Sequence, residues 1–185
     1  MRIDEERLRL FKEGIFELRT RRFGTVAEIM IKKKYNLEKS TNIAYDLLDP
    51  ITGDRAEVKF STVMRSNDSI ISEDNVIEQC INANLRNRMV TSDELYSTAF
   101  DCNIQQVKRK EFEVLYYGLF LYDRIVIFKL FTDNIFLTLG YSDFQHRGNE
   151  GEGQFHITNR SVQYHFDNNF VEWLTYEELY ELFSN

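Results

Sequence analysis

Apolar residues in the first part of the chain recur every three or four positions, with charged residues between them. Over residues 4–22 these apolar positions are Leu8, Phe11, Ile15 and Leu18. This spacing predicts an amphipathic helix. A second helix is predicted over residues 25–35, because Gly24 and Thr25 provide an entry and the following apolar residues keep the helical period. The chain therefore begins with two helices.

The pattern then changes to strands. Residues 42–49 and 56–64 are rich in apolar and β-branched residues and flank the turn sequence PITGDR, which holds the only proline of the chain. This arrangement predicts a β-hairpin. Residues 112–131 are dense in aromatic and β-branched residues and predict two further strands, with a turn near residues 122–124. These two strands are expected at the centre of the sheet.

The connecting segments are less regular. Residues 65–75 form a polar loop in this interpretation, residues 73–89 a helix, and residues 92–106 a short helix or loop. Residues 134–141 suit either helix or strand. Residues 145–166 are expected to be a Gly-rich polar loop, over about residues 145–160, followed by β-like segments. Thr175 followed by Glu178 is a capping box that predicts a C-terminal helix. The whole chain, residues 1–185, is predicted to be a single α/β domain.

Composition agrees with a folded domain that lies away from membranes. Hydrophobic residues make up 43% and aromatic residues 14% of the chain, which is enough for a core. No apolar run reaches the length of a membrane span, and the N-terminus lacks the apolar centre of a secretory signal. Cys80 and Cys102 lack a CxxC spacing, so reduced thiols and a cytoplasmic location are expected.

The net charge of −7 argues against a protein that coats nucleic acid non-specifically. The charge is uneven, however. Residues 1–40 carry eleven Lys or Arg and seven Asp or Glu, whereas residues 150–185 carry one and seven. A basic face is therefore compatible with the acidic average, and acids gathered around a metal ion would also contribute to it.

Glu57 and Lys59 are two apart in the second hairpin strand, so they share a face while their apolar neighbours point the other way. The hairpin register decides which aspartate joins them. An even loop places Asp46 opposite Lys59, and an odd loop places Asp49 opposite Glu57. We expect Asp46, because aspartate next to a turn, as at Asp49, is ordinary.

Two carboxylates and an ammonium group on one face suit a hard divalent cation such as Mg²⁺, which takes oxygen ligands and keeps several waters. Such a site is suited to metal-assisted hydrolysis of a phosphodiester, with the lysine orienting water or neutralising charge on the phosphate. The alternative is an exposed hairpin face with a structural cross-strand Asp–Lys pair. A bare ExK triplet would favour that alternative.

The order of elements separates the two interpretations. A helix with an acid, Glu28, precedes the hairpin that carries Asp46, Glu57 and Lys59. This arrangement resembles the PD-(D/E)xK nuclease superfamily, with Tyr45 in place of its proline. The resemblance implies a restriction-endonuclease-like core over about residues 20–131, with a central mixed β-sheet flanked by helices. It also implies that Asp46 and Glu57 bind the metal, that Lys59 is the catalytic lysine and that Glu28 is an accessory acid.

Further positions are candidates for contact with DNA. The segment around Gln106 and Lys108 looks like the one that follows the active site in many type II restriction enzymes, which implies contacts to the DNA backbone. Lys33, within a run of three lysines, is either a phosphate contact or a solvated helix end. For each of Gln106 and Lys108 alone, ordinary polarity at a strand entry is the simpler interpretation.

Residues 132–185 are expected to hold the DNA-recognition elements. The polar side chains between residues 147 and 160 are of the types that read base edges. These candidates are Arg147, Asn149, Gln154, His156, Asn159 and Arg160. A flexible surface loop is the alternative, and a histidine zinc site is disfavoured because the histidine spacings match no common pattern.

The expected function is a Mg²⁺-dependent, sequence-specific double-stranded DNA endonuclease of the type II restriction class, with Mn²⁺ as a substitute metal. A palindromic site cut on both strands calls for two active sites, so a homodimer is expected. Two alternatives stay open. One is a DNA repair nuclease or junction resolvase of the same superfamily, and the other is a non-enzymatic interaction domain.

Overall fold

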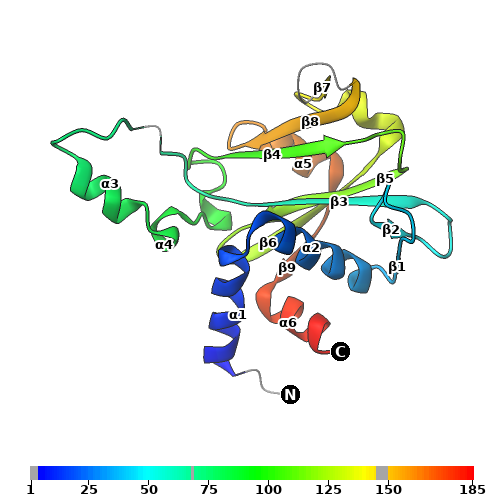
Figure 1. Ribbon diagram of the computed structural model, residues 1–185, viewed down its shortest axis with the longest axis horizontal. Helices are drawn as coiled ribbons and strands as arrows, with labels where there is room; N and C mark the ends of the chain where they lie inside the picture. Colours follow the sequence, from blue (N-terminus) through cyan, green and yellow to red (C-terminus); the bar gives the residue numbers. More distant parts are fainter. Residues whose placement is uncertain (1–3, 68, 145–149) are drawn as a thin grey trace.

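The computed structural model describes residues 4–67, 69–144 and 150–185. Its elements form three layers (Figure 1). A six-stranded sheet lies in the middle, helices cover one face, and a three-stranded sheet with a short helix covers the other. The expected α/β class, with a mixed central sheet flanked by helices, is confirmed.

The helices on the first face are α1 (Glu5–Glu17), α2 (Thr20–Lys34) and α6 (Tyr176–Ser184). The helix predicted over residues 4–22 ends earlier, because Leu18 and Arg19 adopt extended backbone angles and α2 begins directly after them. The capping box at α6 is confirmed: the Glu178 amide donates to the Thr175 hydroxyl, and the Glu178 carboxylate accepts from the Thr175 amide. The last element therefore forms as its local sequence predicts.

The central sheet has the strand order β1-β2-β3-β5-β6-β9. Its strands are β1 (Glu38–Lys39), β2 (Leu47–Leu48), β3 (Arg55–Thr62), β5 (Val114–Phe120), β6 (Arg124–Phe131) and β9 (Phe170–Thr175). β3 and β5 pair in parallel, and the other neighbours pair antiparallel. All seven residues of β5 are buried, which confirms that residues 112–131 supply the centre of the sheet.

Two contacts fix the parallel pairing of β3 with β5. The Arg55 guanidinium lies against the Glu113 carboxylate, with Nε 3.0 Å from both oxygens, and the Glu113 amide donates to the Arg55 carbonyl at 2.9 Å. Phe60 lies opposite Gly118. A Cβ atom at Gly118 would fall 2.5 Å from the Phe60 ring, so only glycine admits that ring.

The second sheet has the order β4-β8-β7. Its strands are β4 (Asp101–Val107), β7 (Ser142–Phe144) and β8 (Glu150–Thr158), and α5 (Val162–Asn169) follows it. The prediction of a short helix or loop over residues 92–106 is wrong from Asp101 onward, where β4 begins, and the strand expected after the Gly-rich loop begins earlier than predicted, at Glu150. The reason is alternation: Gly153, Phe155 and Ile157 are buried against the central sheet while the residues between them are not. The many polar residues of this segment concealed that pattern.

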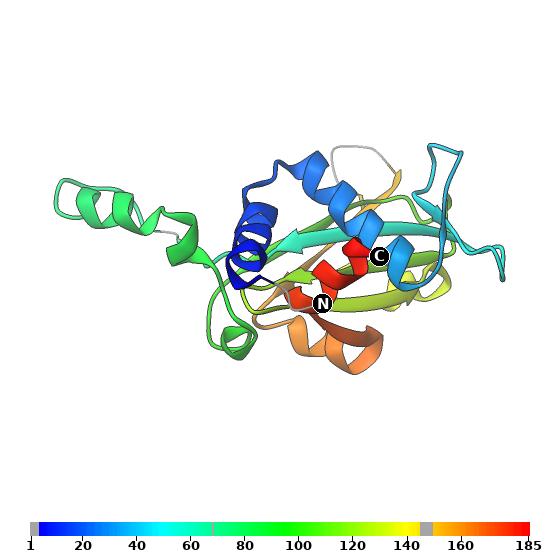
Figure 2. The same cartoon turned by 90° about the horizontal axis from the view of Figure 1, so that it is seen from below.

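Residues 73–89 form two helices instead of one, α3 (Val76–Asn82) and α4 (Leu85–Arg88). The break occurs where the Asn84 side chain accepts from the Arg86 amide at 2.9 Å and caps α4. Short 3₁₀ helices, η1 (Ser92–Glu94) and η2 (Thr132–Leu137), complete the chain. Both views show α3 and α4 extending away from the layered body (Figure 1, Figure 2).

Two apolar clusters hold the layers together, one between the helices and the central sheet and one between the two sheets. Within residues 4–67, 69–144 and 150–185, no helix is long and apolar enough to cross a membrane. The cluster between the sheets contains a histidine, His165, which is fully buried. Its Nδ1 lies 2.9 Å from the Tyr117 hydroxyl, and its ring stacks on Phe155.

Burial lowers the pKa of His165 to about 4, because a charged imidazolium would lose its hydration. The unfolded chain, with a pKa near 6.5, then binds the proton more readily than the folded chain. We therefore expect His165 to reduce the free energy of unfolding as the pH falls from about 6.5 toward 4. Its contribution at pH 5 is a loss of about 2 kcal/mol.

Urea denaturation at pH 7.5 and pH 5 checks this expectation. His165→Phe should remove that share of the pH dependence, whatever it does to stability at pH 7.5. Equal pH dependence in His165→Phe and the parent would contradict the assignment.

Candidate active site

The hairpin register differs from both expected registers. Leu47 pairs with Ala56 and Leu48 with Arg55, and the Asp46 amide also bonds to the Ala56 carbonyl, so Asp46 lies at the end of the ladder, close to Glu57. The predicted pairings of Asp46 with Lys59 and of Asp49 with Glu57 are therefore both wrong. The turn keeps an even number of residues but closes one residue earlier than the pair Pro50 and Arg55, because the Asp49 amide bonds to the Asp54 carbonyl at 2.9 Å. Asp46 still lies near Glu57, whose pKa its negative charge raises.

Asp46 ends the pairing of β2 with β3. Its amide donates to the Ala56 carbonyl at 3.1 Å, and its Oδ2 accepts from the Val58 amide at 2.9 Å. Asp49 instead accepts two amide hydrogen bonds inside the turn, from Ile51 and Thr52. The structure thus holds Asp46 beside the strand that carries Glu57, while the Asp49 carboxylate caps the turn.

Glu57 and Lys59 point into the layer between the two sheets. Their parallel partners Leu115 and Tyr117 belong to the apolar cluster there, and neighbouring strand partners share a face. Lys59 Nζ lies 2.5 Å from Glu57 Oε1. Glu57 is 8% exposed, and its Oε2 has no hydrogen-bond partner among the described residues.

Burial raises the pKa of Glu57 to about 7, and the nearby Lys59 ammonium opposes that rise. The negative charges of Asp46 and Glu111 push the pKa further upward. The carboxylates of Asp46 and Glu111 therefore both lie close enough to Glu57 to raise its pKa. A buried carboxyl that is poised near neutral pH and surrounded by other charges is typical of a functional site.

Glu28 approaches from α2, on the helical side of the central sheet. Burial is the main cause of its raised pKa, and the negative charge of Asp46 adds to the effect. Lys39 and Lys59 lower the same pKa. The charges of Asp46 and Lys59 thus both influence the pKa of Glu28, and its role as an accessory acid stays a prediction.

Sequence reasoning did not single out Glu111 or Lys39. Glu111 lies in the turn between β4 and β5, and its carboxylate is 3.7 Å from Lys108 Nζ. It approaches Glu57 because β5 pairs in parallel with β3, a contact between segments more than fifty residues apart. A local motif holds no signal for such a pairing.

The donor set suits a small, hard cation. Among residues 4–67, 69–144 and 150–185, no group of three or more His, Cys, Asp or Glu side chains has the spacing of a metal cage. Mg²⁺ does not need one, since it is usually held by one or two carboxylates together with waters and substrate phosphates. The buried, unpartnered Oε2 of Glu57 is the atom that such an ion would satisfy.

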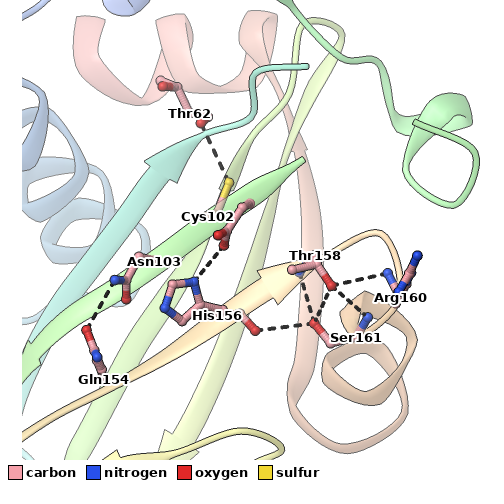
Figure 3. Close-up of polar contacts among 9 residues, drawn as sticks. Thr62, Cys102, Asn103, Gln154, His156, Thr158, Arg160 and Ser161 are labelled. Atoms are coloured by element: carbon pink, nitrogen blue, oxygen red, sulfur yellow. Dashed lines mark hydrogen bonds and ion pairs between the residues drawn. The ribbon is translucent and has the colours of Figure 1, made fainter. Parts of the chain in front are cut away.

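The predicted base-reading residues divide between β8 and the turn after it (Figure 3). Gln154 accepts from Asn103 Nδ2 at 3.2 Å, and His156 Nδ1 lies 2.7 Å from Asp101 Oδ1. These side chains belong to a strand ladder and not to a loop. Asn159 and Arg160 occupy the turn before α5, and Arg160 is exposed. Arg147 and Asn149 lie outside the described residues.

The three residues predicted to contact the DNA backbone lie in separate parts of the structure. Lys33 Nζ donates to the Leu182 carbonyl at 3.2 Å and so joins α2 to α6. Gln106 is exposed at an irregularity of β4, with a left-handed backbone (φ 56°). Lys108 ion-pairs with Glu111 and, at 3.9 Å, with Glu152. Lys108 is therefore the one of these three that is linked to the carboxylates through Glu111.

No protein-family model, no curated protein and no solved structure matches this chain. The resemblance to the PD-(D/E)xK superfamily therefore rests on the sequence motif alone.

We expect Glu57→Gln to stabilise the metal-free protein at pH 8. The folded pKa of Glu57 lies above the unfolded value of 4.5, so the folded state loses stability as the pH rises from about 4.5 to 7. Glutamine cannot ionise and removes this penalty. Between pH 5 and pH 8 the free energy of unfolding of the parent should fall by about 2 kcal/mol relative to Glu57→Gln.

Urea denaturation in the presence of a chelator measures this difference. Glu113→Gln is a matched control, because the Arg55 guanidinium lowers the pKa of Glu113 and the sign of its contribution is opposite. At pH values above the titration of Glu113, Glu113→Gln should lower the free energy of unfolding, because the neutral side chain loses its attraction to Arg55. If Glu57→Gln kept the pH dependence of the parent, the buried carboxyl would not be the titrating group.

Proposed function

We propose that this protein is a Mg²⁺-dependent, site-specific double-stranded DNA endonuclease of the PD-(D/E)xK superfamily. The observation that carries the proposal is the proximity of Asp46, Glu57 and Lys59: Asp46 accepts from the amide of Val58, which lies between the other two, and Lys59 contacts Glu57. The second support is that Glu57 Oε2 is buried and unpartnered while Glu57 titrates near neutral pH. A purely structural cross-strand pair would be expected to satisfy its own oxygens.

In this proposal Asp46 and Glu57 hold the cation through one oxygen each. Asp46 Oδ2 is occupied by the Val58 amide, which leaves Oδ1 for the ion. Glu57 Oε1 contacts Lys59, which leaves Oε2. Bound Mg²⁺ would supply positive charge to the scissile phosphate.

Lys59 then acts beside the metal ligands. Its ammonium is fixed against Glu57 Oε1 and presents its remaining N–H donors toward the attacking water or a phosphate oxygen. Glu28 is the accessory acid, since its carboxyl responds to the charges of both Asp46 and Lys59. Glu111 keeps Lys108 near the carboxylates, where that lysine is available to a phosphate.

Incubating plasmid DNA with the protein and Mg²⁺ tests the proposal. We expect discrete fragments for the parent and at least about a 100-fold lower cleavage rate for Lys59→Ala, because preorganised charge stabilisation of this kind is worth about 10²–10³ in rate. Lys34→Ala is the matched control: Lys34 also ion-pairs with a glutamate, Glu172 at 2.9 Å, but on the other face of the sheet. It should cut as the parent does.

The pattern of products distinguishes the alternatives. Discrete bands support site-specific cleavage, whereas a smear or selective cutting of four-way junctions would favour the repair enzymes of the same superfamily. Equal cutting by Lys59→Ala and the parent would contradict the site. Absence of cutting, combined with absence of Mg²⁺ or Mn²⁺ binding at millimolar concentration in calorimetry, would favour an interaction domain.

A further inference from the structure

Residues 65–88 form an arm that leaves the layered body and carries α3 and α4. Figures 1 and 2 show it extending to one side in two perpendicular views. No residue of α3 is buried. Five large apolar side chains of the arm are exposed: Ile70, Ile71, Val76, Ile77 and Ile81. Such a concentration on one projecting element is unusual for a surface that faces only water.

The amphipathic pattern of α3 is inverted. Its apolar stripe runs along Val76, Ile77, Cys80 and Ile81, which are all exposed, with Ile77 at 71% and Ile81 at 53%. The opposite, polar face contacts the chain: Gln79 accepts from Asn67 Nδ2 at 2.7 Å. Gln79 and Asn82 also line a polar pocket of about 340 Å³ at the base of the arm. A helix of a globular protein normally buries its apolar stripe.

The charged residues of the arm indicate which kind of partner can bind its apolar stripe. Glu73, Asp74 and Glu78 lie at or just before the start of α3, and Arg86 lies on α4 at the other end. The acids flank the apolar stripe, so they would repel DNA phosphates and anionic lipid headgroups. A surface with acids at one end, isoleucines in the middle and a base at the other end is complementary to itself when two copies run antiparallel.

We propose that the arm is a dimerisation surface, with a second copy of this chain packed against it about a two-fold axis. The axis passes near the middle of α3, so that the isoleucine stripes of the two copies face one another. Each acidic end then approaches Arg86 of the other copy. Arg86 already contacts Glu13 at 2.6 Å, but its side chain is 64% exposed and has further N–H donors.

The position of the arm agrees with this role. Because the arm projects, two copies can join through it while their layered bodies stay apart. The inference is independent of the proposed function, since it rests only on the apolar and charged residues of the arm.

Cys80 provides a direct test. It is exposed within the stripe of α3, whereas Cys102 is buried. Near a two-fold axis at the middle of α3, the two Cys80 thiols come close together. We expect a short bismaleimide to convert most of the parent protein to a covalent dimer, and Cys80→Ser to abolish that product.

The oligomeric state of the full chain supplies the second measurement. Analytical ultracentrifugation at tens of micromolar should give a dimer for the parent and a monomer for Ile77→Glu/Ile81→Glu, which changes exposed residues only. Ile51→Glu/Leu137→Glu, at exposed apolar residues outside the arm, is the matched control and should stay dimeric.

Three results would overturn the proposal. The first is a monomeric parent, including one that instead sediments with phosphatidylcholine vesicles. The second is a dimer that persists in Ile77→Glu/Ile81→Glu. The third is a dimer that is lost in the control variant as well. Loss of DNA cleavage alone would not bear on it, because the readouts are mass and cross-linking.

Discussion

The parallel pairing of β3 with β5 is the contact on which the rest of the structure depends. It joins the hairpin to the buried centre of the sheet and is fixed by Arg55 against Glu113. The pairing turns Glu57 and Lys59 toward the layer between the sheets. It also brings the turn before β5, with Glu111, to the same place. A shift of this register by one residue would turn Glu57 toward the helices and away from the other carboxylates.

The same pairing explains why the site is energetically costly. Glu57 lies beside fully apolar residues of β5, so its ionised form is poorly hydrated and its carboxyl titrates near neutral pH. Lys59 offsets only part of this penalty. A fold that keeps an unpartnered buried carboxylate oxygen gives up stability that glutamine would restore. Such a trade is found where binding or catalysis requires the charge.

The arm shows a similar conflict at the surface. Its helix α3 forms from a clear apolar stripe, yet the body of the protein contacts the polar side. The exposed isoleucines and the buried carboxyl are thus two places where the isolated chain does not satisfy its own chemistry. In the two proposals, the buried carboxyl binds a cation with its phosphate ligand, and the exposed isoleucines pack against a second copy of the chain. Together they would place two sites in one assembly, as cutting both strands of a duplex requires.

Local sequence determined the elements whose signals lie within a few residues. The capping box at Thr175, the strand containing Glu57 and Lys59, and the aromatic strand pair over residues 112–131 all follow from short-range periodicity and hydrogen bonding. The order of Glu28, Asp46, Glu57 and Lys59 along the chain is the local signal on which the proposed site rests. Local sequence did not reveal β4 or the full extent of β8, because their alternation is masked by polar residues that pair with one another.

Only the tertiary structure decided the register of the hairpin and the surroundings of its carboxylates. Asp46 lies near Glu57 because the turn closes at Asp49 and Asp54, a register that the turn sequence alone did not reveal. Glu111 joins them through a pairing of distant segments, and the burial that raises the pKa of Glu57 comes from the second sheet and β5. Desolvation and long-range pairing are properties of the packed chain, so no local motif contains them.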